Sequence, residues 1–113
     1  MVFFGIIAIM NTIVPKDAEK MIGEGGVVVL DVRSPEEYAE GHLAGAINMN
    51  INDAGFADNV RALDRDKKYV VYCLAGGRGG RAVSLMNELG FKDAKNLVGG
   101  ITVWKSEGLP VEK

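Results

Sequence analysis

The chain has 113 residues, 48% hydrophobic and 25% charged, which is typical of one globular domain with a buried core. Its net charge of −2 argues against the basic surface that nucleic-acid binding needs. A single cysteine excludes an intramolecular disulfide, and no cluster of histidine and cysteine is present to hold a metal. We therefore expect residues 1–113 to form one cytoplasmic domain that binds no metal, cofactor, nucleic acid or membrane.

The first ten residues are almost wholly apolar, but no basic residue precedes them and no cleavage pattern of small residues follows. They are also too few for a helix that spans a bilayer. We expect the first buried strand within Ile6–Ile13, with Met1–Phe4 exposed or packed on a partner subunit.

Helix and strand signals alternate along the next part of the chain. A proline at a first helical position predicts a helix over Pro15–Ile22. The apolar run Val27–Leu30 predicts a central strand that ends at Asp31. Ser34–Glu37 supplies a capping serine, a proline at the first helical position and the glutamate of a capping box. This second helix is short, because Gly41 ends it.

The same alternation continues to the end of the chain. We predict a strand over Ala46–Met49, a helix from Asn52 through Leu63, a strand over Lys68–Tyr72, a helix that contains Val83–Leu89, a strand over Ala94–Val98 and, after Gly99–Gly100, a last helix that buries Trp104. Strands that alternate with helices predict a parallel α/β sheet covered on both faces.

The only cysteine, Cys73, stands where a buried strand gives way to a glycine-rich loop and then to helical spacing. At such a place, loop N–H groups converge and the following helix adds its positive N-terminal end. Both favour the thiolate, which is the nucleophilic form of cysteine. Arg78 adds positive charge, whereas Arg81 is expected at the surface. The alternative is a buried, inert core cysteine.

The segment Cys73–Arg78 resembles the active-site loop of rhodanese-type sulfurtransferases, in which a cysteine and the five residues after it form a cradle. Three further segments resemble the same family in the same order, namely Leu30–Tyr38, Glu40–Asn48 and Asn96–Trp104. The resemblance implies a rhodanese-like α/β fold with a five-stranded, mostly parallel sheet flanked by helices on both faces. It also implies that Cys73 is catalytic and that the substrate-binding cradle consists of Leu74, Ala75, Gly76, Gly77 and Arg78.

The implied reaction moves sulfane sulfur from a donor, thiosulfate or a persulfide, through a Cys73 persulfide to cyanide, a thiol or a sulfur-relay protein. Many thiosulfate-using relatives carry a polar or basic residue directly after the cysteine, where this chain has Leu74 and Ala75. Gly79 stands where a serine is common. These differences keep the nucleophile but favour a persulfide on a small thiol or on another protein as the donor.

Two other functions remain open. In cysteine-dependent phosphatases five residues separate the cysteine from the arginine, and here only Leu74–Gly77 do so. The shorter loop should form a tighter cradle, which suits one extra sulfur better than a tetrahedral phosphate, and the same argument applies to an arsenate reductase-like enzyme. Non-catalytic rhodanese-like modules, which bind partners, tend to have lost the cysteine that this chain keeps.

Three polar residues are expected to serve structure more than chemistry. His42, the only histidine, falls in a turn after the second predicted helix, where a structural role outweighs that of a base for Cys73. Asp31 and Arg33 follow the end of a strand and so reach the same sheet edge as Cys73. We expect them to hold loops together through hydrogen bonds and an ion pair.

Overall fold

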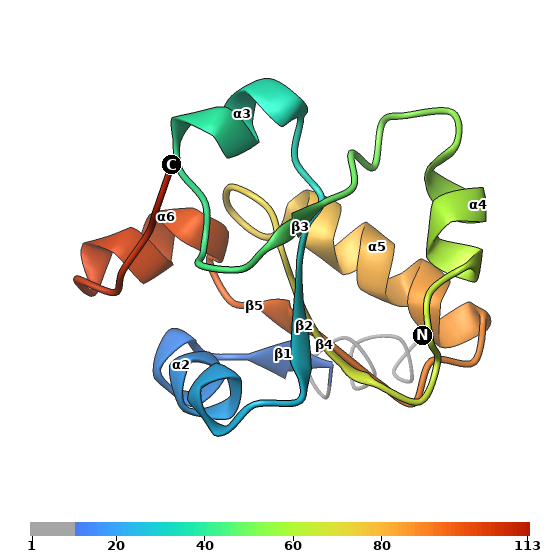
Figure 1. Cartoon of the computed structure of the whole chain (residues 1–113), viewed down its shortest axis with the longest axis horizontal. Helices are drawn as coiled ribbons and strands as arrows, with labels where there is room; N and C mark the ends of the chain where they lie inside the picture. The colour runs from blue at the N-terminus through green and yellow to red at the C-terminus, as the bar shows by residue number, and fades with distance from the viewer. Residues whose placement is uncertain (1–10) are drawn as a thin grey trace, which may run out of the picture.

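The structure, a computed structural model, describes residues 11–113 and contains one five-stranded sheet (Figure 1). The strands are β1 (Thr12–Ile13), β2 (Val27–Asp31), β3 (Ile47–Asn48), β4 (Lys68–Tyr72) and β5 (Asp93–Leu97), in the order β1-β5-β4-β2-β3. Every neighbouring pair is parallel. The predicted five-stranded parallel sheet is therefore confirmed. The expectations for Met1–Phe4 and for a strand beginning at Ile6 lie outside the described residues, except that β1 occupies the end of that predicted strand.

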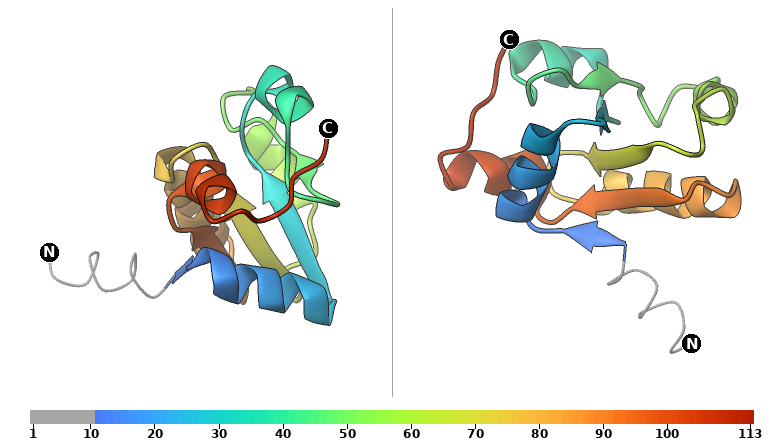
Figure 2. Two further views of the ribbon diagram at one scale, coloured as in Figure 1. Left: turned by 90° about the vertical axis from the view of Figure 1, so that its left-hand side faces the viewer. Right: turned by 60° about the horizontal axis from the view of Figure 1, so that its bottom comes forward.

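The helices are α2 (Pro15–Glu24), α3 (Pro35–Glu40), α4 (Phe56–Arg61), α5 (Gly77–Glu88) and α6 (Gly100–Ser106). Seen from the left of Figure 1, α2 and α6 lie in front of the strands and α5 lies behind them (Figure 2). Among residues 11–113 no helix is both long and apolar enough to cross a membrane.

Two hydrophobic clusters fill the space between the sheet and the helices, one on each face. Phe56 and Val60 of α4 and Met86 of α5 pack with one set of strand side chains. Ala18 of α2 and Trp104 of α6 pack with the other set, so the expected core position of Trp104 is confirmed. Alternate residues of β4 enter opposite clusters, which explains why the whole run from Tyr69 is apolar and aromatic.

The predicted capping box is present at the start of α3. The Ser34 hydroxyl accepts from the Glu37 N–H at 3.2 Å, and the Glu37 carboxylate accepts from the Ser34 N–H at 3.2 Å. Both bonds are local in sequence, which is why the sequence pattern predicts them well.

The prediction for α4 is wrong at its start, because the helix begins at Phe56 and not at Asn52. The side chains of Asn50 and Asp53 accept hydrogen bonds from the backbone N–H groups of Asn52 and Gly55. Each of these hydrogen bonds stabilises a local turn. Asn and Asp side chains that bind the backbone in this way compete with helix formation. Helix α2 extends two residues beyond the predicted Ile22, to Glu24.

Candidate functional site

Cys73 directly follows β4, at the edge of the sheet where all the strands end. Its side chain is 1% exposed and belongs to the cluster that α4 and α5 cover. The Gly76 N–H donates to its Sγ at 3.0 Å. Helix α5 begins at the next residue, Gly77, so the sulfur lies close to the positive end of a helix. Negative charge on Sγ is therefore favoured by a direct donor and by the helix.

The loop between Cys73 and α5 is short and partly open to solvent. Leu74 is 48% exposed and Ala75 is also exposed, while Gly76 takes a φ of +121° that L side chains rarely adopt. The predicted cradle residues thus divide between this loop and the helix, because Gly77 and Arg78 form the first turn of α5. The apolar spacing of this helix begins only after Gly80, so the helix starts earlier than the sequence pattern indicates.

Helix α6 binds the outer side of this loop. The N–H groups of Ile101 and Thr102 donate to the carbonyl oxygens of Cys73 and Leu74 at 2.9 and 3.1 Å. Gly100 makes this approach possible, since a Cβ at that position would overlap both carbonyl groups. The last helix therefore sets the position of the loop.

Asn96 on β5 is a residue of the site that the sequence analysis missed. Its Nδ2 donates to the Gly76 carbonyl at 3.0 Å, which also accepts from the Gly80 N–H at 2.9 Å. Its Oδ1 is buried and has no hydrogen-bond partner within residues 11–113. A Cβ at Gly79 would collide with that oxygen, so the glycine makes room for Asn96. A polar side chain inside an expected buried strand was the signal for it.

Arg78 points its guanidinium at a carboxylate that the sequence analysis did not connect with it. Nη1 and Nη2 donate to the two carboxylate oxygens of Glu37 at 2.7 and 3.0 Å. The hydrogen bonds from Arg78 lower the pKa of Glu37 to about 2, and the bond to Glu37 raises the pKa of Arg78. A negative charge on Cys73 would raise the pKa of Arg78 further.

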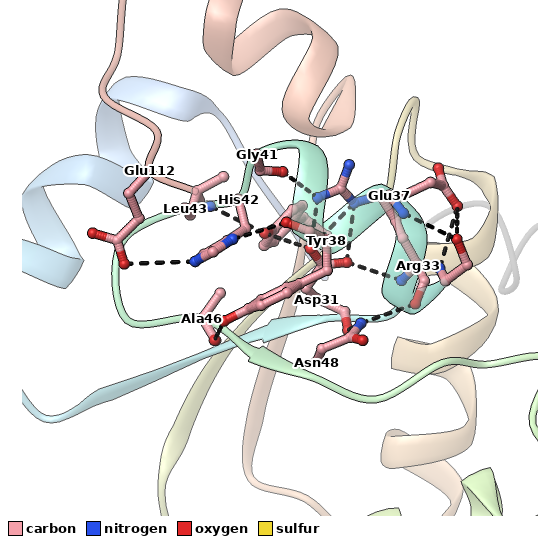
Figure 3. Close-up of polar contacts among 12 residues, drawn as sticks. Asp31, Arg33, Glu37, Tyr38, Gly41, His42, Leu43, Ala46, Asn48 and Glu112 are labelled. Carbon is pink, nitrogen blue, oxygen red and sulfur yellow. Dashed lines mark hydrogen bonds and ion pairs between the residues drawn. The ribbon is translucent and has the colours of Figure 1, made fainter.

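A buried polar network lies beside the cradle (Figure 3). Arg33 donates from Nε and Nη2 to the Asp31 carboxylate and from Nη2 to the Gly41 carbonyl at 2.7 Å. The Tyr72 hydroxyl donates to Asp31 Oδ2 at 2.7 Å and accepts from the Leu43 N–H. Burial raises the pKa of Tyr72, so the hydroxyl stays a proton donor. The expected structural ion pair of Asp31 and Arg33 is confirmed.

His42 packs against helix α3 and the C-terminal segment. Its ring stacks on Tyr38 with centroids 3.7 Å apart, and its Nδ1 lies 2.9 Å from the Tyr38 carbonyl. Its Nε2 lies 3.6 Å from the Glu112 carboxylate, and the backbones of His42 and Glu112 pair (Figure 3). The expected structural role of His42 is confirmed.

The site therefore combines one nucleophile with one observed backbone donor, the Gly76 N–H, and no side-chain base in contact with Sγ among the described residues. Residues 11–113 also hold no group of three or more His, Cys, Asp or Glu side chains arranged for a metal. This arrangement can attack an electrophilic atom and hold the resulting anion against N–H groups.

Comparison with known proteins identifies the family, although one similar solved structure, from Rhodopseudomonas palustris (26% identical, TM-score 0.71, covering 90% of this chain and 84% of that one), is described as a "Possible Tyrosine Phosphatase". Residues 14–107 match the family described as "Rhodanese-like domain". "Thiosulfate sulfurtransferase 16, chloroplastic" of Arabidopsis thaliana is 37% identical, with 74% of this chain and 78% of the relative covered. "Thiosulfate sulfurtransferase GlpE" of Pseudomonas fluorescens Pf-5 is 32% identical, with 82% and 84% covered. The crystal structure of a rhodanese-related protein from Thermoplasma volcanium superposes with a TM-score of 0.81 at 36% identity, covering 90% of this chain and 97% of that one.

Proposed function

The chain belongs to the rhodanese-like family, and on this premise we propose that it is a sulfurtransferase that carries sulfane sulfur as a persulfide on Cys73. The observation that carries the proposal is the Gly76 N–H on Sγ at the start of α5, because the same geometry stabilises an anionic sulfur attached to Cys73. The names of its relatives support the reaction class.

The reaction has two displacements. The Cys73 thiolate attacks the outer sulfur of the donor, the sulfur–sulfur bond of the donor breaks, and the remainder leaves with the bonding electron pair as sulfite or as a thiolate. An acceptor thiolate or cyanide then attacks the outer sulfur of the persulfide and releases the Cys73 thiolate. No oxidant or reductant is needed, because the sulfur passes between nucleophiles at one oxidation state. This is covalent catalysis.

The cradle residues have separate roles in this proposal. The backbone N–H groups of Leu74 to Arg78, including Ala75, Gly76 and Gly77, surround the outer sulfur. Glu37 fixes the Arg78 guanidinium, and with it the first turn of α5. Leu74 and Ala75 give the rim an apolar character, which favours a persulfide on a thiol over thiosulfate as the donor. We propose the cytoplasm as its location.

The proposal is tested by incubating the protein with thiosulfate or inorganic polysulfide and measuring its intact mass. We expect a gain of one sulfur that a reductant removes, and thiocyanate formation when cyanide follows. The Cys73→Ser variant should do neither while keeping the fold, because no other thiol exists in the sequence. Thiocyanate formation by that variant at the original rate would refute the mechanism. Hydrolysis of an aryl phosphate by the unmodified protein, without sulfur transfer, would favour the phosphatase alternative instead.

A further inference from the structure

A pocket of about 350 Å³ lies beside the cradle, between the end of α3 and the first turns of α6. Leu74, the residue that follows Cys73, forms part of its lining, and Ile101 of α6, a core residue that is 3% exposed, is a second apolar lining residue. This volume is at the lower end of the range for small-molecule sites. The pocket is therefore suited to a small molecule with a short apolar part.

Two of the charged residues that line the pocket are already compensated. Arg33 is paired with the buried Asp31, and Glu37 is paired with Arg78. Neither pair presents a net charge to a ligand. A doubly negative donor such as thiosulfate therefore gains no electrostatic attraction from them.

Two other lining residues keep their charges available. Glu40 ends α3 and Lys105 lies on α6, so an anion and a cation reach the pocket from two different elements. Both residues are exposed, and neither side chain forms a hydrogen bond or ion pair with any of residues 11–113. The pocket thus offers one free charge of each sign next to an apolar surface.

We propose that this pocket binds a low-molecular-weight thiol that carries both an ammonium and a carboxylate group, as an α-amino acid does, and that this thiol or its persulfide exchanges sulfur with Cys73. Glu40 pairs with the ammonium, Lys105 pairs with the carboxylate, and Leu74 and Ile101 contact the methylene next to sulfur. The inference rests on the proposed sulfur transfer and names its substrate class.

The sulfur step is the same displacement run in either direction. As donor, the thiol's persulfide loses its outer sulfur to the Cys73 thiolate, its sulfur–sulfur bond breaks, and the electron pair stays on the thiol's own sulfur. As acceptor, the thiolate attacks the outer sulfur on Cys73 and the Cys73 thiolate leaves. A proton moves only to or from the free thiol.

The test uses protein loaded with inorganic polysulfide, and intact mass follows the loss of the extra sulfur to four thiols. Cysteine carries both charges, cysteamine only the ammonium, 3-mercaptopropionate only the carboxylate, and 2-mercaptoethanol neither. Because these thiols differ in intrinsic reactivity, the quantity compared is each variant's rate relative to the unmodified protein with the same thiol. The variants are Glu40→Gln and Lys105→Gln. Glu88→Gln and Lys67→Gln make the same charge changes at exposed positions near the opposite edge of the sheet.

We expect Lys105→Gln to slow transfer to cysteine and 3-mercaptopropionate about two- to fivefold, the range for an exposed ion pair, and to leave cysteamine unchanged. Glu40→Gln should slow cysteine and cysteamine by a similar factor and leave 3-mercaptopropionate unchanged or slightly faster. A general loss of structure cannot produce this crossed pattern. Equal effects on all four thiols, or the same effects from the two control variants, would contradict the proposed binding of the thiol in this pocket. Failure of Cys73 to load at all would instead refute the proposed sulfur transfer, and the pocket's role with it.

Discussion

Two arginine–carboxylate pairs lie at the edge of the sheet that carries Cys73, and they differ in their access to water. The side chains of Arg33 and Asp31 are 5% and 0% exposed, whereas those of Arg78 and Glu37 are 24% and 28% exposed. The first pair belongs to a buried hydrogen-bond network that also includes the Tyr72 hydroxyl and the Gly41 carbonyl. The second holds one turn of helix beside the sulfur. We infer from this difference that the Asp31–Arg33 pair stabilises the fold, whereas the Glu37–Arg78 pair positions the reactive loop.

Asp31→Ala should produce the largest effect, and it should fall on stability. The substitution leaves the Arg33 guanidinium and the Tyr72 hydroxyl buried without their partner. We expect a loss of about 3–5 kcal/mol in the free energy of unfolding. Denaturant titration measures it, and sulfur loading per folded molecule should persist. A loss below about 1 kcal/mol would show that the network is replaceable.

Gly79→Ala should give an intermediate effect, located in α5 next to the cradle. Its new Cβ collides with Asn96 Oδ1, and overpacking of this kind costs about 1–3 kcal/mol. Asn96→Ala in the same chain removes the obstacle, so the double variant should be more stable than the sum of the two single changes predicts.

The control for this pair is Gly23→Ala, also inside a helix but with nothing within 4 Å of the added Cβ. We expect it to stabilise the protein by about 0.5–1 kcal/mol, as Ala does relative to Gly in a helix. Unfolding curves of all the variants supply the comparison. Strict additivity of Gly79→Ala and Asn96→Ala would mean that the two residues do not contact each other.

Glu37→Gln should have the smallest destabilising effect of the three, and this effect should depend on pH. Glutamine can still accept from the Ser34 N–H, so the change removes mainly the charge that Arg78 binds. Because the folded protein lowers the pKa of Glu37 from 4.5 to about 2, its stabilisation is complete above pH 4.5 and disappears as the pH falls toward 2. We expect a difference of about 1 kcal/mol at neutral pH, since water screens the pair. A difference that is the same at pH 3 and pH 7 would contradict the ion pair.

The features that the sequence predicts correctly are those whose partners are close in the chain. The capping box spans four residues, and the place of Cys73 between strand and helix follows from one continuous run. The pairing of Arg78 with Glu37 and the bond from Asn96 to Gly76 join separate elements, and no local pattern specifies them. The predicted start of helix α4 was wrong although the contacts involved are local. The side chains of Asn50 and Asp53 accept hydrogen bonds from nearby backbone N–H groups, and the residue that caps the start of a helix does the same, so the sequence pattern does not distinguish the two.

The bonds from α6 to the cradle have a consequence for synthesis of the protein. The carbonyl groups of Cys73 and Leu74 are bound by N–H groups of Ile101 and Thr102, which leave the ribosome later. A nascent chain that ends after α5 has neither these donors nor Asn96, and it also lacks β5, which pairs with β4 in the sheet. Domains generally fold as units. The reactive centre is therefore complete only after the C-terminal segment has been synthesised.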